Sequence, residues 1–355
     1  MVSMGNRIKV LIVDDSALMR QQLTLLLSKH PCIEVIGSAR DGREGVEKAI
    51  RLQPDVVTMD IHMPTMDGIT ALQYVMEIAP RPVIILSAYS RKGALVTFEA
   101  LELGAFDYVT KPEVMGAAEM RKTVDLLVER IVAAASGSSR TRKRPDDEYA
   151  EEAEERGEPF RKAIVIGAST GGPRAVEDVV RHLPPDLPAP VFLVQHMPPL
   201  FTSSFAERLN EKYPIKTVEG AHRMPVEPGT VYVAPGGKHM TVEKVLGKRQ
   251  YRIAVGALPK ETVFKPSVDV TMMSLLERLP ASKLIGVLLT GIGSDGAQAM
   301  VEIKKRGGFT IAEAEETAVV YGMPRAAAEM GGASVVLPYS QIGRFIVGEV
   351  MRDGS

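Results

Sequence analysis

The feature that constrains this chain most is a repeated alternation of short apolar runs with longer amphipathic segments. Within residues 7–135 the runs are rich in β-branched residues: Ile8–Val13, Ile33–Ala39, Asp55–Met59, Pro82–Leu86 and Phe106–Val109. Continuous apolar runs of this length are typical of parallel strands that are buried on both faces. The segments between them, such as 17–28, have the apolar spacing of helices. Five strand–helix units in succession therefore predict a doubly wound parallel sheet.

The composition changes over residues 136–160. This segment begins with serine and glycine, continues with a basic cluster around Arg142 and ends in a nearly unbroken acidic run. It has too few apolar residues to offset the entropy of ordering the chain. We interpret it as a linker, either a solvated tether or a segment that also docks a partner.

The strand–helix alternation then resumes over residues 161–352, which we interpret as a second domain. Further strands are predicted at Ala163–Ile166, Pro190–Val194, Lys216–Val218, Thr230–Val233 and Leu284–Leu289. Two more runs, Met240–Lys244 and Gln250–Val255, flank a turn at Gly247 and predict a hairpin. The fold class is therefore α/β in both domains, with an antiparallel addition in the second.

Composition excludes several classes of protein. A net charge of −1 does not indicate a protein that coats nucleic acid or an anionic membrane. The single cysteine, Cys32, allows no internal disulfide and is either a small buried apolar residue or a reactive thiol, the former being commoner. No stretch approaches the roughly 18 to 20 apolar residues of a membrane helix. We expect the protein to be a cytoplasmic monomer and not to insert into a membrane.

Acidic and hydroxyl residues follow the strands of the first domain. Asp14 and Asp15 follow the first predicted strand, Asp60 the third and Ser87 the fourth, and Lys111 comes just after the fifth. In open α/β sheets such residues meet at the carboxyl edge. Clustered carboxylates favour a hard divalent cation such as Mg²⁺. A carboxylate beside that ion can attack a phosphoryl group, whose oxygens a lysine and a hydroxyl can hold.

These residues, with the motif Asp60-Ile-His-Met-Pro64 and the pair Lys111-Pro112, resemble the receiver domains of two-component response regulators. The resemblance implies a flavodoxin-like (βα)5 fold over residues 7–135. It also implies that Asp60 accepts the phosphoryl group and that Ser87, Lys111 and the switch aromatic Tyr108 respond to it. The implied Mg²⁺ ligands are Asp14, Asp15, Asp60 and the backbone carbonyl of His62. Lys111-Pro112 is a candidate cis peptide.

The second domain opens with a glycine-rich loop. The strand Ala163–Ile166 leads into Gly167-Ala168-Ser169-Thr170-Gly171-Gly172, and a helix is predicted from Pro173. Such a loop either cradles a phosphate or presents Ser169 as a nucleophile. It matches neither the dinucleotide-binding nor the P-loop glycine pattern.

A base and an orienting acid follow two other strands of this domain. His196 comes after Pro190–Val194, and Asp295 after Leu284–Leu289. Both are therefore expected at the same sheet edge as Ser169, where the three could act as nucleophile, general base and imidazole orienter. Among the other histidines, His182 is interpreted as a surface residue of a helix, and His239 as a loop residue that could line the pocket.

Motifs spread over residues 161–350 strongly resemble the chemotaxis protein-glutamate methylesterases, the CheB family. They are Gly-Ala-Ser169-Thr-Gly-Gly, Gln195-His-Met-Pro198, Arg223–Pro225, Gly229-Thr-Val-Tyr-Val-Ala-Pro-Gly-Gly237, Pro266-Ser-Val-Asp269, Thr290-Gly-Ile-Gly-Ser-Asp295 and Tyr321-Gly-Met-Pro324. The resemblance implies a doubly wound methylesterase domain that hydrolyses glutamate γ-methyl esters on methylated chemotaxis receptors. It also implies a chemotaxis histidine kinase as phosphodonor, and an autoinhibitory receiver that Asp60 phosphorylation relieves.

By this resemblance Ser169 attacks the ester, His196 accepts its proton and Asp295 steadies the imidazolium. The developing oxyanion needs donors, and the backbone amides of Thr170 and Ile292 are the candidates. Because an ester has a good leaving group, we expect no cofactor for this half of the chain.

One stretch departs from the family pattern. Glu313-Ala314-Glu315 stands where the family usually has Gln-Asp-Glu. The departure bears on the pocket rim and on the deamidation of receptor glutamines, which several members of the family also catalyse. The main rival interpretation is a response regulator whose second domain only binds a partner or DNA. Residues 161–355 show no helix-turn-helix signature, so we expect no nucleic-acid partner.

Overall fold

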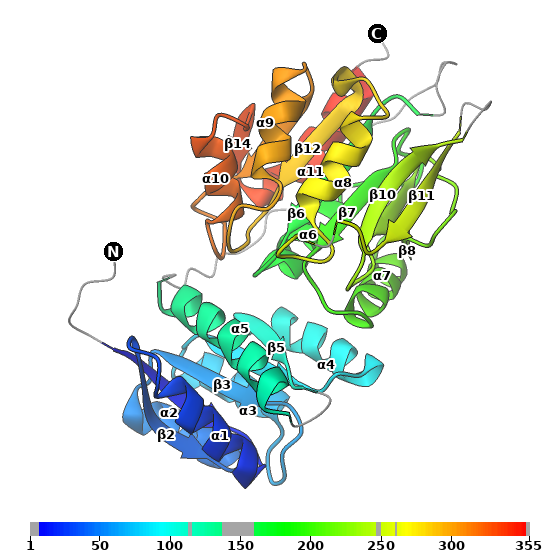
Figure 1. Ribbon diagram of the computed structural model, residues 1–355. Helices are drawn as coiled ribbons and strands as arrows, with labels where there is room; N and C mark the ends of the chain where they lie inside the picture. The colour runs from blue at the N-terminus through cyan, green and yellow to red at the C-terminus, as the bar shows by residue number, and fades with distance from the viewer. Residues whose placement is uncertain (1–6, 113–115, 137–159, 246–249, 260, 353–355) are drawn as a thin grey trace. The chain divides into compact units, whose positions relative to one another are not determined.

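The chain consists of two compact units that divide between Lys143 and Arg144 (Figure 1). The computed structural model describes residues 7–112, 116–136, 160–245, 250–259 and 261–352. Most of the predicted linker, residues 137–159, lies outside the described residues. Phe160, predicted as the last linker residue, is buried in the second unit with its ring centroid 5.5 Å from that of Tyr251.

The first unit is a five-stranded parallel sheet in the order β2-β1-β3-β4-β5. Its strands are β1 (Ile8–Val13), β2 (Ile33–Ala39), β3 (Val56–Asp60), β4 (Val83–Ser87) and β5 (Asp107–Thr110). Its helices are α1 (Ala17–Leu27), α2 (Gly42–Leu52), α3 (Gly68–Ile78), α4 (Arg91–Glu102) and α5 (Ala117–Ser136). This is the predicted fold class, and it is confirmed.

Polar residues begin four of these helices. The side chains of Ser16, Asp41, Asp67 and Ser90 each accept a hydrogen bond from the backbone amide three residues further on. These caps satisfy amide groups that have no partner within the helix. They fix where each helix starts and hence how long each strand–helix loop is. The acidic residues at the strand ends are held in short loops as a result.

The second unit has a seven-stranded parallel sheet in the order β14-β13-β12-β6-β7-β9-β8. Its strands are β6 (Ala163–Ala168), β7 (Val191–Gln195), β8 (Lys216–Glu219), β9 (Thr230–Val233), β12 (Leu284–Leu288), β13 (Phe309–Glu313) and β14 (Val335–Leu337). The predicted hairpin is confirmed as β10 (His239–Lys244) paired antiparallel with β11 (Tyr251–Gly256). The helices are α6 (Gly172–Val180), α7 (Phe201–Lys212), α8 (Val268–Leu276), α9 (Ala297–Lys305), α10 (Met323–Glu329) and α11 (Tyr339–Arg352), with a short 3₁₀ turn at Ala281–Lys283.

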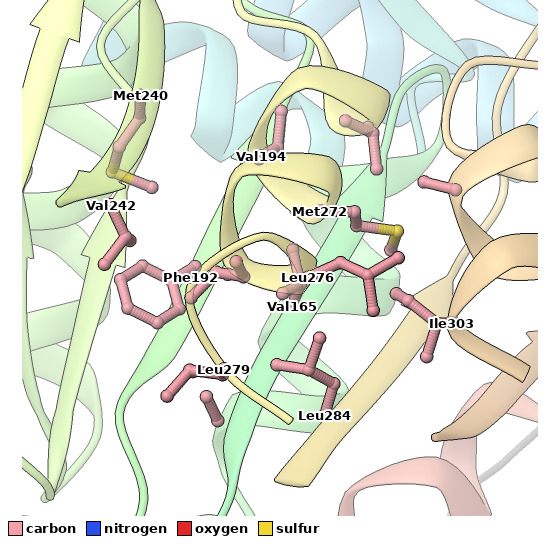
Figure 2. Packing of buried hydrophobic residues seen from close by; sticks show 14 of the residues in the cluster. Val165, Phe192, Val194, Met240, Val242, Met272, Leu276, Leu279, Leu284 and Ile303 are labelled. Atoms are coloured by element: carbon pink, nitrogen blue, oxygen red, sulfur yellow. The ribbon is translucent and has the colours of Figure 1, made fainter. Parts of the chain in front are cut away.

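The hairpin and α8 complete a continuous apolar core over the sheet of the second unit. Figure 2 shows Val165 and Phe192, from β6 and β7, beside Met272 and Leu276 of α8, with Val242 of β10 on the far side of Phe192. All five side chains are at most 6% exposed. Burial of this kind is the dominant favourable contribution to folding. It also anchors α8, whose first turn contacts the candidate site.

Candidate active site

In each sheet there is one point from which the chain adds strands first on one side and then on the other. The predicted functional residues lie at these points. In the second unit the chain runs outward from β6 through β7 on one side and from β12 through β13 on the other. In the first unit the corresponding point lies between β1 and β3. Ligands of open α/β sheets bind in the crevice at such a point, outside the carboxyl ends of the strands. The topology therefore marks one candidate site in each unit.

Ser169 follows the last residue of β6 and is 4% exposed. Its amide donates to the carbonyl oxygen of Thr290 across the β6–β12 boundary (3.0 Å), and its own carbonyl accepts from the side chain of Gln195 (2.8 Å). Gly171, with φ of +76°, turns the chain into α6. A Cβ at Gly171 would lie 2.5 Å from Val319, so no larger residue fits there. The loop is thus fixed on both sides.

His196 follows β7 directly, as predicted, and stands beside Ser169. The register pairs Ala168 with Gln195, and the amide of His196 donates to the carbonyl of Ala168 (3.0 Å). Its Nε2 lies 2.8 Å from Oδ2 of Asp295, so the structure brings these two predicted residues into contact. Its Nδ1 is buried and has no hydrogen-bond partner among the described residues. No Ser169–His196 hydrogen bond is present among those residues, so Nδ1 is the ring nitrogen left for the serine.

Asp295 is held at the start of α8. Its two oxygens accept from the hydroxyl of Ser267 (2.9 Å) and from the amides of Val268 (2.7 Å) and Asp269 (3.1 Å). A carboxylate at a helix N-terminus is favoured by the helix dipole and by the unpaired amides there. Burial acts to raise the pKa of Asp295, but His196 and two of these amides outweigh burial and lower it below its usual value. The group is therefore an anion that orients the imidazole.

Two residues of this site were not predicted to act in it. The ring of Phe264 stacks on His196, with centroids 4.2 Å apart and planes within 9°. Ser267 caps α8 and contacts Asp295. Ser267 lies in the motif Pro266-Ser-Val-Asp269. A polar residue directly before an apolar run is a sequence signal for the start of a helix, and it could have identified Ser267 as a helix cap. Phe264 carries no such signal, because its role depends on a contact with a residue 68 positions away along the chain.

The amides of Thr170 and Ile292, the candidate oxyanion donors, stay free for a ligand. Neither donates a hydrogen bond to another of the described residues. Thr170 is 1% exposed, and its hydroxyl has no partner in the described part of the chain. Buried polar atoms without partners are uncommon in folded proteins. These groups beside Ser169 therefore suit a bound polar atom such as a carbonyl oxygen.

Glu313, the first residue of the departure at 313–315, lies in a different place from the one expected, whereas Glu315 is exposed. Glu313 is not at a pocket rim: it is 0% exposed at the end of β13. Its Oε2 accepts from the amide of Thr290 (2.7 Å), and its Oε1 from the hydroxyl of Thr317 (3.0 Å). Burial raises the pKa of Glu313 to about 7, although both hydrogen bonds act to lower it. The rim expectation was wrong for this residue because the strand carries it below the loop.

Two histidines differ from their predicted settings. His182, interpreted as a surface residue, is 8% exposed, and its Nδ1 lies 2.9 Å from the carbonyl of Asp178. His239 begins β10 and is 1% exposed, with Nε2 bonded to the carbonyl of Pro259 and to the hydroxyl of Thr262. Burial lowers the pKa of His239. Both histidines are therefore buried and hydrogen-bonded, and the prediction that His239 lines the pocket stays a prediction.

The predicted acidic cluster of the first unit is present at the carboxyl edge of its sheet. Asp14, Asp15 and Asp60 each place a carboxylate oxygen within 4.8 Å of the others. Lys111 bridges two of them, with Nζ 2.7 Å from Asp14 Oδ2 and 2.7 Å from Asp60 Oδ2. Burial acts to lower the pKa of Lys111, but the two carboxylates raise it above its usual value. The lysine is therefore a fixed cation beside Asp60.

The other predicted receiver residues are Ser87, Tyr108 and His62, and the first two are buried. The hydroxyl of Ser87 bonds to the hydroxyl of Thr97 (2.7 Å) and to the carbonyl of Gly93 (3.2 Å), both in α4. Tyr108 is 8% exposed, and burial raises the pKa of its hydroxyl far above its usual range. The backbone carbonyl of His62 accepts no hydrogen bond from another described residue. The cis peptides among the described residues are Leu258–Pro259 and Lys265–Pro266, so the candidate Lys111–Pro112 is not one of them.

Comparison with known proteins assigns a family to each unit. Residues 164–346 match the family model described as CheB methylesterase, and residues 10–125 match that of the response regulator receiver domain. The chain belongs to the CheB methylesterase family. A CheB-family relative from Carboxydothermus hydrogenoformans, named protein-glutamate methylesterase/protein-glutamine glutaminase 2, is 49% identical over 96% of this chain and 99% of its own length. The predicted family is confirmed.

Two more relatives agree with this assignment. A protein-glutamate methylesterase/protein-glutamine glutaminase from Caldanaerobacter subterraneus is 48% identical, with 98% of each chain covered. The crystal structure of the Thermotoga maritima CheB methylesterase catalytic domain has a TM-score of 0.51 at 40% identity, and the match covers 53% of this chain and 97% of that one. The CheB-family catalytic domain thus corresponds to the second unit. No helix of the described residues is long and apolar enough to cross a membrane.

Proposed function

We propose that this chain hydrolyses glutamate γ-methyl esters of chemotaxis receptors in the cytoplasm and that its receiver unit regulates this activity. The observation that carries the proposal is the His196–Asp295 contact, which leaves the buried Nδ1 of His196 without a partner among the described residues. His196 follows the strand next to that of Ser169, and its amide donates to the carbonyl of Ala168. A general base needs one ring nitrogen held by an acid and the other directed at the nucleophile. Asp295 holds one ring nitrogen of His196 in this arrangement, and we assign the other, Nδ1, to Ser169.

The reaction follows from these positions. His196 Nδ1 takes the proton of Ser169 as Oγ attacks the ester carbonyl, and the amides of Thr170 and Ile292 stabilise the resulting oxyanion. The C–O bond to the methoxy group then breaks, and the imidazolium returns the proton so that methanol leaves. Water, deprotonated by His196, then attacks the acyl-enzyme, the bond to Ser169 Oγ breaks, and the imidazolium returns the proton to Oγ as the glutamate carboxyl is freed. Asp295 stabilises the imidazolium in both steps.

The same machinery can take a receptor glutamine as a second substrate. The relatives above are named for a glutaminase activity as well as for a methylesterase. Ammonia replaces methanol as the leaving group, so proton donation by His196 becomes more demanding. Glu313, the first residue that departs from the family pattern, is 0% exposed and therefore does not contact a substrate directly.

For the receiver unit we propose phosphorylation of Asp60 by a chemotaxis histidine kinase. Three clustered carboxylate oxygens fit Mg²⁺, which prefers oxygen ligands, and Asp14, Asp15, Asp60 and the His62 carbonyl would hold it. The ion supplies charge neutralisation for phosphoryl transfer. Lys111, already 2.7 Å from Asp60, is positioned to bind a phosphoryl oxygen, and Ser87 would bind another after leaving its contacts with α4.

Methanol release from a methylated receptor cytoplasmic fragment is expected to rise when Mg²⁺ and acetyl phosphate are added. In Asp60→Asn the rise should be absent, since the amide cannot accept a phosphoryl group. The unstimulated rate of each protein, measured without phosphodonor, is the internal reference. An absence of methanol release from wild-type protein with a validated substrate would contradict the esterase assignment. A rise that survives in Asp60→Asn would contradict only the regulatory one.

Deletion of residues 1–140 is expected to increase the unstimulated rate of methanol release. In our proposal the receiver unit covers the Ser169 site until Asp60 is phosphorylated. Removal of the receiver unit should therefore mimic activation. The second unit has its own sheet and core, and the matching Thermotoga maritima structure is that of a catalytic domain, 97% of which is covered by the match. The truncated and full-length proteins are compared by kcat at saturating receptor fragment. An equal or lower rate in the truncated protein argues against masking.

A further inference from the structure

We propose that Glu313 is a positioning residue of the Ser169 site, which acts through Thr290 to hold the nucleophile loop in place. This inference rests on the proposed esterase function, and it adds a buried residue that is not part of the Ser169–His196–Asp295 set. Three observations carry it: the contacts of Glu313, the contacts of Thr290, and the absence of a charged partner for the buried carboxyl group in the described part of the chain.

The first observation is that Glu313 is an acceptor for a loop and not a surface acid. It ends β13, next to β12 in the sheet, and its side chain runs under the segment that follows β12. Oε2 accepts the amide of Thr290, the second residue after β12, at 2.7 Å. Without that acceptor the amide of Thr290 would be buried and unpaired, which is rare in folded proteins.

The second observation is that Thr290 joins the two halves of the candidate site. Its carbonyl accepts the amide of Ser169 (3.0 Å), and its hydroxyl donates to the carbonyl of Thr170 (2.9 Å). The same hydroxyl accepts the amide of Val320 (2.9 Å). Thr290 is 0% exposed. Through these bonds any shift of Thr290 moves both the nucleophile and the candidate oxyanion amide of Thr170.

The adjacent glycine makes this coupling tight. Gly291 follows Thr290, and a Cβ built there would lie 2.7 Å from the Cβ of Ser169 and 2.3 Å from the sulfur of Met323. The loop therefore packs against Ser169 with no spare space. No side chain fits at residue 291, so the backbone after Thr290 runs directly against Ser169 and Met323.

The third observation is that no cation among the described residues neutralises Glu313. Only burial, the Thr290 amide and the Thr317 hydroxyl shift its pKa, which lies at about 7. The described elements packed against β13 carry charged groups that do not contribute: Glu302, Lys304 and Lys305 of α9, Arg325 and Glu329 of α10, Arg344, Glu349 and Arg352 of α11, and Glu315 and Glu316 of the following loop. Burying a carboxyl group without a cation costs free energy. We infer that the hydrogen bonds accepted by Glu313 are what this burial serves.

Substitutions that separate shape from hydrogen bonding test this role. Glu313→Gln keeps an acceptor for Thr290 and can donate to the Thr317 hydroxyl, whereas Glu313→Met fills a similar volume with no such acceptor. We expect Glu313→Met to lower kcat for methanol release by roughly 10- to 100-fold with KM little changed, because misplaced catalytic groups slow the chemical step. Glu313→Gln should stay within about 3-fold of wild type. Equal kcat values for both variants would overturn the proposal.

A readout that needs no turnover separates this inference from the function on which it rests. Hydrogen exchange of the Thr290 amide in the full chain should quicken by at least about 10-fold in Glu313→Met and remain slow in Glu313→Gln. If Glu313→Met fails to fold, Glu313→Asp, which is one methylene shorter, replaces it with the same expectations. Slow exchange in both variants overturns the positioning role. If the wild-type protein releases no methanol but the Thr290 amide exchanges fast in the Met or Asp variant, only the proposed esterase function is refuted.

Discussion

Replacement of Ser169 by alanine is expected to lower methanol release by roughly 10³-fold or more while leaving the fold intact. The alanine lacks the oxygen that forms the acyl-enzyme, so only transition-state binding by the surrounding amides would remain. The backbone of residue 169 keeps its bonds to Thr290 and Gln195, because these involve main-chain atoms of Ser169 only. The measurement is kcat for methanol release together with the melting temperature of the same preparation.

Ser203→Ala in α7 is the matched control. Its hydroxyl donates to the carbonyl of Leu200 and takes no part in the site, so kcat should match wild type. A Ser169→Ala protein that is folded and still hydrolyses the ester within about 10-fold of wild type would remove Ser169 as the nucleophile. Water or another residue would then have to attack.

Glu313→Gln is expected to make the second unit more stable than wild type at pH 8.5, by up to about 3 kcal/mol, and nearly equal to it at pH 4.5 or below. The pKa of Glu313 is about 7 in the folded protein against an ordinary value of 4.5. Between those values the folded state binds the extra proton, so the free energy of unfolding falls as pH rises. A shift of about 2.5 units corresponds to roughly 3 kcal/mol. Glutamine does not ionise and avoids this loss.

Denaturant-dependent hydrogen exchange of β12 and β13 amides in the full chain measures this free energy for the second unit alone. Glu316→Gln, an exposed position three residues away, is the control and should follow the pH dependence of wild type. The quantity of interest is the difference between variants, since the other titrating groups cancel in it. Parallel pH dependences for wild type and Glu313→Gln would show that residue 313 does not ionise over this range.

The residues that follow strands could be predicted from the sequence. Asp14, Asp60, Ser169 and His196 each stand where a buried apolar run meets the first polar residues, and parallel strands carry all such points to one edge. The strand ends themselves shifted by one or two residues: Asp60 and Ser87 end their strands and do not follow them. The hydrophobic pattern identifies a strand more securely than its last residue.

The supporting residues could not be predicted because their roles depend on contacts between distant segments. Phe264 stacks on His196, and Glu313 bonds Thr290, without any local pattern that marks either contact. β14 is only Val335–Leu337, an edge strand with partly exposed residues, and was not predicted. His182 was predicted within a helix and at the surface, but α6 ends at Val180 and the residue packs against Gly343 of α11.

The side chain of Val268 joins the packing of the second unit to its chemistry. It lies between two glycines: a Cβ at Gly167 would come within 2.5 Å of Val268 Cγ1, and a Cβ at Gly296 within 2.6 Å. The amide of the same residue donates to Asp295 Oδ2 at 2.7 Å. A larger or smaller side chain would move the start of α8 and turn the carboxylate that aims His196. A substitution of Val268 is therefore expected to change turnover together with folding stability, because one residue serves both the core packing and the Asp295 contact.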